Sequence, residues 1–105
     1  LPLLPRMASD PDQEVRLAVA SRLQVPALLA MRNDPEVAVR RLVVHRLPVG
    51  LLADMADDPA WEVRWEVAQR ADPALARRLL VDDEAEVREA ARVRLTTLES
   101  EARHG

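Results

Sequence analysis

The residues of this chain that could do chemistry recur at fixed spacing. An aspartate returns every 24 residues, and an arginine follows each aspartate by six positions. The aspartates are Asp10, Asp34, Asp58 and Asp82, and the arginines are Arg16, Arg40, Arg64 and Arg88. A guanidinium binds a carboxylate or a phosphate through two parallel hydrogen bonds. The pattern therefore predicts either a ladder of structural ion pairs between repeated units or a track of phosphate contacts.

The structural ladder is the interpretation that the charge balance favours. Every arginine of the column has an aspartate available at fixed spacing, and the formal net charge is −3. Nucleic-acid-binding surfaces are usually basic and contact phosphates mainly through Arg and Lys. We expect the aspartates to cap helices and the arginines to form the ladder, and nucleic-acid binding through the arginine column stays the alternative. A second arginine column flanks the apolar positions and consists of Arg22, Arg46, Arg70 and Arg94.

Trp61 and Trp65 are the only aromatic residues, and they lie four positions apart. Side chains at this spacing share one face of a helix, and the face predicted here points away from the apolar side. Leu17, Val37 and Arg41 occupy neighbouring positions in adjacent copies. Because Trp and Arg are enriched in binding hot spots, these five residues predict a surface for a partner or for self-association. The alternative is that the tryptophans fold over neighbouring helices and cover them.

Catalytic and metal chemistry have little support in the sequence. His45 and His104 are the only histidines, and there is no cysteine to form a zinc-thiolate or iron–sulfur site. Acidic residues at the predicted helix starts are explained by the helix dipole. No serine stands in a nucleophile elbow. We therefore expect no enzymatic activity, no cofactor and no metal site.

The 24-residue period predicts four copies of one helical unit. The copies are residues 1–23, 24–47, 48–71 and 72–95, followed by a C-terminal helix extension and tail at 96–105. Each copy has a proline turn, a short apolar segment that fits one or two turns of α or 3₁₀ helix, and then an Asp-Pro pair. With aspartate as the N-cap and proline as the first helical residue, the long helix of the first copy should span residues 11–23.

The long helices are amphipathic, and their apolar positions form columns. The side chains expected inside are Val15, Val19 and Leu23; Val39, Val43 and Leu47; Val63, Val67 and Ala71; and Val87, Ala91 and Leu95. One copy cannot bury such a face alone, whereas stacked copies can, so we expect an all-α solenoid. The fourth copy has Asp83 in place of proline and no proline after Leu95, which predicts a capping helix that continues through Ala102.

The repeat resembles known helical-repeat families. The segment Asp-Pro-Asp-Gln-Glu-Val-Arg-Leu-Ala-Val-Ala-Ser-Arg-Leu is similar to HEAT-type helices, but 24 residues are too few for a HEAT unit. With Leu-Leu-x-x-Met-Ala preceding Asp-Pro, positions 1–95 resemble the leucine-rich repeat variant family. The resemblance implies alternating α and 3₁₀ helices in a right-handed superhelix. That family's best-known architecture carries an N-terminal cysteine-ligated cluster domain, for which this chain offers no ligand.

These observations favour a protein–protein interaction or scaffold module, with a protein partner or a homo-oligomer. A repeat appendage of an iron–sulfur protein, with its cluster domain upstream of Leu1, is a further alternative. No apolar run approaches the roughly 20 residues that span a membrane. The short start Leu1-Pro2-Leu3-Leu4-Pro5 does not form a signal peptide. We expect a cytoplasmic protein, and the use of Arg and Ala without Lys suggests a bacterial source.

Overall fold

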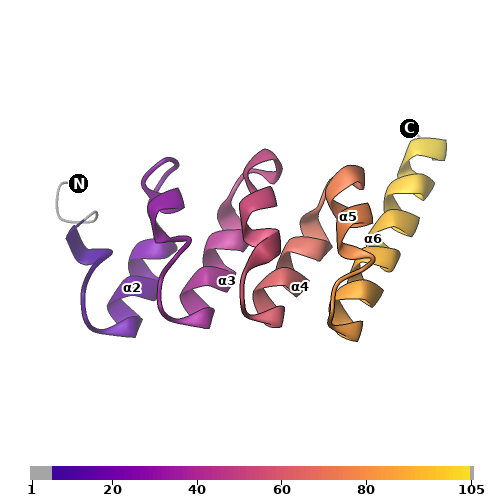
Figure 1. Cartoon of the computed structure of the whole chain (residues 1–105). Coiled ribbons are helices and arrows are strands. Elements are labelled where there is room, and N and C mark those ends of the chain that lie inside the picture. The colour runs from indigo at the N-terminus through magenta and orange to yellow at the C-terminus, as the bar shows by residue number, and fades with distance from the viewer. Residues whose placement is uncertain (1–5, 105) are drawn as a thin grey trace. The chain divides into compact units, whose positions relative to one another are not determined.

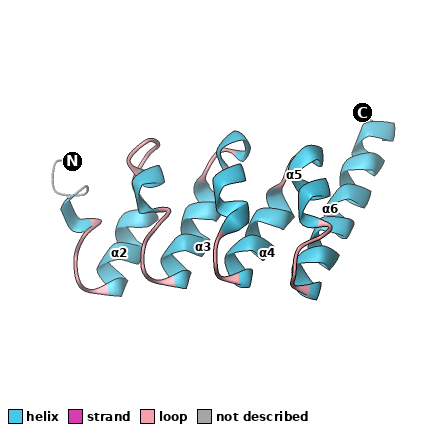
Figure 2. Ribbon diagram, in the orientation of Figure 1, coloured by secondary structure: helices cyan, strands magenta, loops and turns pink. Residues whose placement is uncertain are grey.

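The computed structural model describes residues 6–104, and every regular element in that range is a helix, as Figure 2 shows. No strand occurs among these residues. The prediction of an all-α protein is thereby confirmed. The turn and apolar segment predicted at the start of the first copy fall mainly on residues 1–5, outside the described range.

The chain divides into two compact units, Leu1–Pro48 and Val49–Gly105. The division lies one residue from the predicted border between the second and third copies. In the first unit, α2 (Gln13–Ala20) packs against α3 (Val37–Arg46), and the 3₁₀ helix η1 (Leu28–Met31) also packs against α3. Figure 1 shows α2 and α3 side by side.

The second unit begins with two short 3₁₀ helices, η2 (Val49–Leu51) and η3 (Ala53–Asp57). They are followed by α4 (Trp61–Arg70), α5 (Pro73–Leu79) and α6 (Ala85–His104). The last helix packs against both α4 and α5, and η3 packs against α4 (Figure 1). The short element before each long helix is therefore 3₁₀ in η1 and η3 and α in α5, within the range that the sequence predicted.

The long helices begin two residues later than predicted. The N-cap positions are Asp12, Glu36 and Ala60, and the prolines of the Asp-Pro pairs lie in bends before the helices. The carbonyl of an N-cap residue accepts the first hydrogen bond inside the helix. The Asp10 carbonyl instead accepts from the Arg16 side chain, while the Asp12 carbonyl accepts from the Arg16 amide. The arginine column thus moves the helix start downstream of the aspartate.

Most residues of the predicted apolar columns are buried in the core. Val39, Val43 and Leu47 have no exposed surface, and neither do the column residues Val63, Val67, Ala71, Val87 and Ala91 of the following copies. Val15 and Leu95, at the two ends of the columns, are only half-buried. The short segments add Leu28, Leu52 and other aliphatic side chains to the core, whereas Met7 of the first copy is 40% exposed.

The last helix is twice as long as its counterparts. It runs for 20 residues, against 10 in α3 and in α4. No proline follows Leu95 to stop it, so it continues to His104, two residues beyond the predicted Ala102. Its second half extends past the part of the helix that carries the repeated columns.

Removing a buried leucine from the second unit should destabilise the chain strongly. Leu52 has no exposed surface, so Leu52→Ala leaves a cavity and should cost about 2–5 kcal/mol of unfolding free energy. Leu80 in the same unit is 37% exposed, and Leu80→Ala should cost less than about 1 kcal/mol. Urea titration followed by circular dichroism measures both. Equal losses for the two variants would contradict the described core.

Candidate functional site

Each aspartate of the column closes a tight turn before its helix. Its Oδ1 accepts a hydrogen bond from the backbone amide two residues later, at 2.8–2.9 Å. The accepting residues are Asp10, Asp34, Asp58 and Asp82. These are side-chain turns of the kind that Asp favours, and they replace the N-caps that the sequence predicted.

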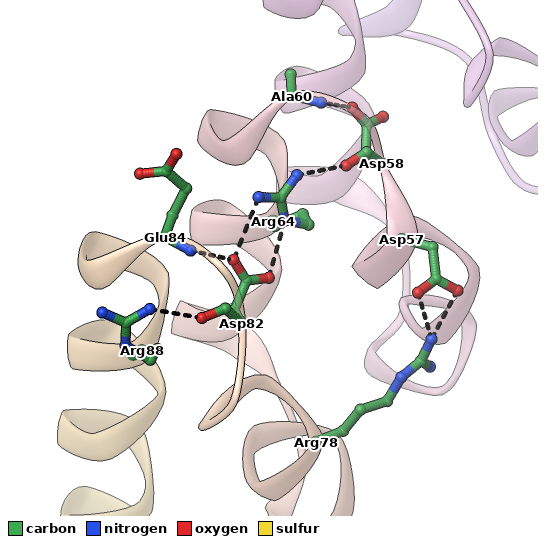
Figure 3. Close-up of polar contacts among 8 residues, drawn as sticks. All are labelled: Asp57, Asp58, Ala60, Arg64, Arg78, Asp82, Glu84 and Arg88. Carbon is green, nitrogen blue, oxygen red and sulfur yellow. Dashed lines mark hydrogen bonds and ion pairs between the residues drawn. The ribbon is translucent and has the colours of Figure 1, made fainter.

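The arginines join the turns of consecutive copies. In the first unit the Nε of Arg16 donates to Oδ2 of Asp34 at 2.8 Å, and its Nη1 donates to the Asp10 carbonyl at 2.9 Å. In the second unit Arg64 donates to both carboxylate oxygens of Asp82, at 2.8 and 3.2 Å (Figure 3). Its Nη1 donates to the Asp58 carbonyl at 2.7 Å. One guanidinium therefore holds its own turn and the next one.

Both ion pairs are largely shielded from water. The side chains of Arg16 and Asp34 are 9% and 4% exposed, and those of Arg64 and Asp82 are 14% and 7% exposed. Burial by itself raises the pKa of Asp82, but hydrogen bonds from the Arg64 guanidinium and the Glu84 amide bring it below the ordinary 3.8. The same contact with Asp82 raises the pKa of Arg64. Both groups therefore stay charged near neutral pH.

The other two arginines of the first column make the same backbone contact. Nη1 of Arg40 donates to the Asp34 carbonyl at 2.8 Å, and Nη1 of Arg88 donates to the Asp82 carbonyl at 2.7 Å. Arg88 is exposed, unlike Arg16. All four arginines of the column thus donate to the carbonyl of the aspartate six residues earlier, and the last of them is exposed.

The second arginine column satisfies carbonyl groups at helix ends. Nη1 of Arg46 donates to the carbonyls of Ala20 and Leu23, at 2.7 and 2.5 Å. Nε of Arg94 donates to the Ala71 carbonyl at 2.8 Å. These carbonyls lie at or just beyond the C-termini of α2 and α4, where the last carbonyls of a helix lack intrahelical partners. The sequence showed this column but not its role.

The two tryptophans differ in their surroundings. Trp61 is 37% exposed, whereas Trp65 is half-buried and lines an open groove of about 740 Å³ between α4 and α6. The residues that line this α4–α6 groove are Trp65, Gln69, Ala85, Glu86, Glu89, Ala90, Val93, Arg94 and Thr97. None of them belongs to the Asp–Arg ladder. The groove is therefore a surface separate from the contacts that hold the turns together.

The groove includes Trp65 alone of the five residues predicted for partner binding. Leu17 lies on α2, and Val37 and Arg41 lie on α3, so all three belong to the first unit, where they are half-buried. Trp61 begins α4 and is exposed, but it does not line the groove. The site shown in the second unit is thus built from α4 and α6 rather than from residues spread over the copies.

Small side chains in the last copy help to open the groove. Ala90 stands where α3 has Leu42 and α4 has Glu66, and Ala85 stands where they have Val37 and Trp61. Both alanines line the groove together with Trp65, whose side chain is half-buried. This change of side-chain size between copies is visible in the sequence, and it is the signal that could have pointed to α6 as a wall of the site.

The described residues contain neither a metal-binding cluster nor a membrane-spanning helix. Among residues 6–104, no three or more His, Asp and Glu side chains gather closely enough to hold a metal ion. The helices within the same range are too short or too polar to cross a bilayer. A second hollow, in the first unit, is lined by the ladder residues Asp10, Arg16 and Asp34 and their neighbours, whereas the α4–α6 groove lies outside the ladder.

Comparisons with protein-family models, with curated proteins and with solved structures find no match to this chain. The resemblance to leucine-rich repeat variants consequently rests on the 24-residue motif itself.

Acid should remove the contribution of the Asp82 ion pair to stability. A carboxylate whose pKa is lowered by folding stabilises the folded state above its unfolded pKa, near 4, and loses that effect as pH falls through the folded pKa. Asp82→Asn should therefore cost about 1.5–3 kcal/mol at pH 7. The difference from the parent protein should shrink below about pH 4. Urea titrations of both proteins between pH 7 and pH 2 measure this difference.

The exposed neighbour Asp83 supplies the control. Asp83→Asn makes the same chemical change one residue away and should alter stability by less than about 0.5 kcal/mol at pH 7. A cost for Asp82→Asn that stays constant down to pH 2 would contradict the role given to its charge.

Proposed function

We propose that this chain is a protein-binding scaffold module with no catalytic activity of its own. The α4–α6 groove is the observation that carries the proposal. It combines a partly uncovered indole and small apolar side chains with three charged residues, and an apolar centre with a polar rim is typical of binding surfaces. Exposed Trp61 on the same helix adds apolar surface beside it.

We further propose that the four copies stack into one right-handed superhelical solenoid of the leucine-rich repeat variant type. Within each unit, consecutive copies are joined by the same Arg–Asp contact, 18 residues apart in sequence. The short helices before α3 and α4 are 3₁₀, as the family resemblance implies. These features support the proposal because stacked repeats reuse one interface along the chain.

Nucleic-acid binding through the arginine column has less support. The Arg16 and Arg64 guanidinium groups already donate to carboxylates and carbonyls, so a phosphate would have to compete with buried ion pairs. The groove contains Glu86 and Glu89, which would repel a polyanion. A protein partner fits this surface better.

Substitution along the arginine column tests the four-copy stack. Arg16→Gln and Arg64→Gln break ion pairs within each unit and should each lower the Tm by roughly 5–15 °C. If the stack continues through all four copies, Arg40→Gln should have a similar effect. Exposed Arg88→Gln is the control and should cost less than about 1 kcal/mol.

Differential scanning calorimetry of the four variants measures these shifts. An Arg40→Gln protein as stable as the Arg88→Gln protein would contradict the stack. Unchanged stability together with loss of salt-dependent DNA binding would instead favour the nucleic-acid alternative.

Removing the indoles tests the binding function. Cross-linking capture from a bacterial extract should recover a partner whose affinity falls about 30-fold with Trp65→Ala, as expected for a hot-spot residue. Trp61→Ala should weaken the same complex less, because Trp61 lies outside the groove. Val81→Ala removes an 83% exposed apolar side chain away from the groove and serves as the control. Identical partners and an identical oligomeric state for all variants would refute the proposal.

A further inference from the structure

We infer that the α4–α6 groove receives an amphipathic α-helix from a partner protein, carrying a basic side chain near one end and an acidic side chain near the other. This inference rests on the proposed binding function and specifies the partner's chemistry. Three features of the groove support it: its length along α6, its apolar lining and its two separated charges.

The length of the groove suits a short helix. Its α6 wall runs from Ala85 to Thr97, which at 1.5 Å per residue is about 18 Å, or three turns of helix. The wall residues recur three or four positions apart, as an α-helix exposes one face. An amphipathic helix laid into a groove between two helices is a common mode of peptide recognition. Strand addition is not open to this unit, because residues 49–104 contain no sheet edge.

The apolar lining of the groove is suited to pack against aliphatic side chains of a partner helix. Trp65, Ala85, Ala90 and Val93 supply apolar surface, and Val93 is 50% exposed in the absence of a partner. The Thr97 hydroxyl donates to the Val93 carbonyl at 3.1 Å, so its polar group is satisfied within α6. An apolar face of a partner helix could therefore cover this hydroxyl without leaving it unpaired.

The charges of the groove reduce to two that are available to a partner. Glu89 is paired with Arg92 one turn along the helix. Within residues 6–104 the side chain of Glu86 makes no hydrogen bond or ion pair, and it is exposed. Arg94 is anchored through Nε on the Ala71 carbonyl. Glu86 and Arg94 are eight residues apart, about 12 Å along α6, so each can meet an opposite charge on a bound helix.

Trp65 fluorescence provides a direct test. In a Trp61→Phe protein, Trp65 is the only indole and reports burial of the groove by a blue shift of its emission. The probes are three synthetic 14-residue helical peptides with leucines three and four positions apart. Each peptide has two charged positions eight residues apart, which carry Lys and Glu, two Glu, or two Lys. The peptide with Lys and Glu can meet both groove charges in one of its two binding directions, whereas the other two peptides can meet only one groove charge in either direction.

The peptide with one Lys and one Glu should bind about two- to five-fold more tightly than either of the others, as exposed charge pairs predict. Glu86→Lys makes both ends of the groove basic and should shift the preference to the peptide with two Glu. Glu99→Lys makes the same change at an exposed residue of α6 outside the groove and should leave the preference unaltered. An unchanged preference in the Glu86→Lys protein would overturn the charge assignment.

Filling the groove tests the site independently of charge. Ala90→Leu introduces the residue that α3 carries at the same position and should weaken the best peptide at least roughly ten-fold, since it removes the space beside Trp65. Its Tm, compared with that of the parent protein, shows whether the fold is kept. If Ala90→Leu lowers the Tm, the smaller Ala90→Val takes its place.

The outcomes separate this inference from the proposed function. If none of the three peptides shifts the Trp65 emission, the inference is overturned, while a captured partner that depends on Trp65 would leave the binding function standing. A concentration-dependent shift without peptide, abolished by Ala90→Leu, would identify a second copy of this chain as the occupant instead. If no peptide shifts the Trp65 emission and no captured partner depends on Trp65, both the inferred helix binding and the proposed binding function are rejected.

Discussion

A single guanidinium in each unit holds together the turns of two consecutive copies. Arg64 donates to the carbonyl of Asp58 in its own copy and to the carboxylate of Asp82 in the next. The same carboxylate accepts from the Glu84 amide at the start of α6 (Figure 3). One aspartate therefore serves both its own turn and the neighbouring copy. Burying such charges would be costly without this complete set of partners.

The core of this chain, which has almost no aromatic residues, repeats with the same period as the ladder. This core consists of Val, Leu, Ala and Met, and most of the core residues on the long helices recur every 24 positions. Within each unit, neighbouring copies meet through equivalent side chains, so the ladder and the apolar columns repeat together. Outward positions are under no such constraint. Trp61 and Trp65 occur at positions where the other copies carry different residue types.

Apart from Arg94, which belongs to the second arginine column, the groove is formed by residues at such outward positions. None of its lining residues belongs to the Asp–Arg ladder, so its shape can change without loss of the contacts between turns. In α6, Ala85 and Ala90 replace larger residues of the other copies, and Trp65 of α4 faces the space that they leave. A specific surface can thus evolve on a repeated scaffold at little cost in stability.

The sequence by itself determined the all-helical character, the 24-residue period and most of the buried columns, because these depend on local propensity and periodicity. Only the tertiary structure decided where the helices begin, since the Asp10 carbonyl is taken by Arg16, six residues away. It also decided that Arg46 and Arg94 serve helix ends more than 20 residues earlier. The groove too was decided by the tertiary structure, because a small side chain leaves a space only where no other element fills it.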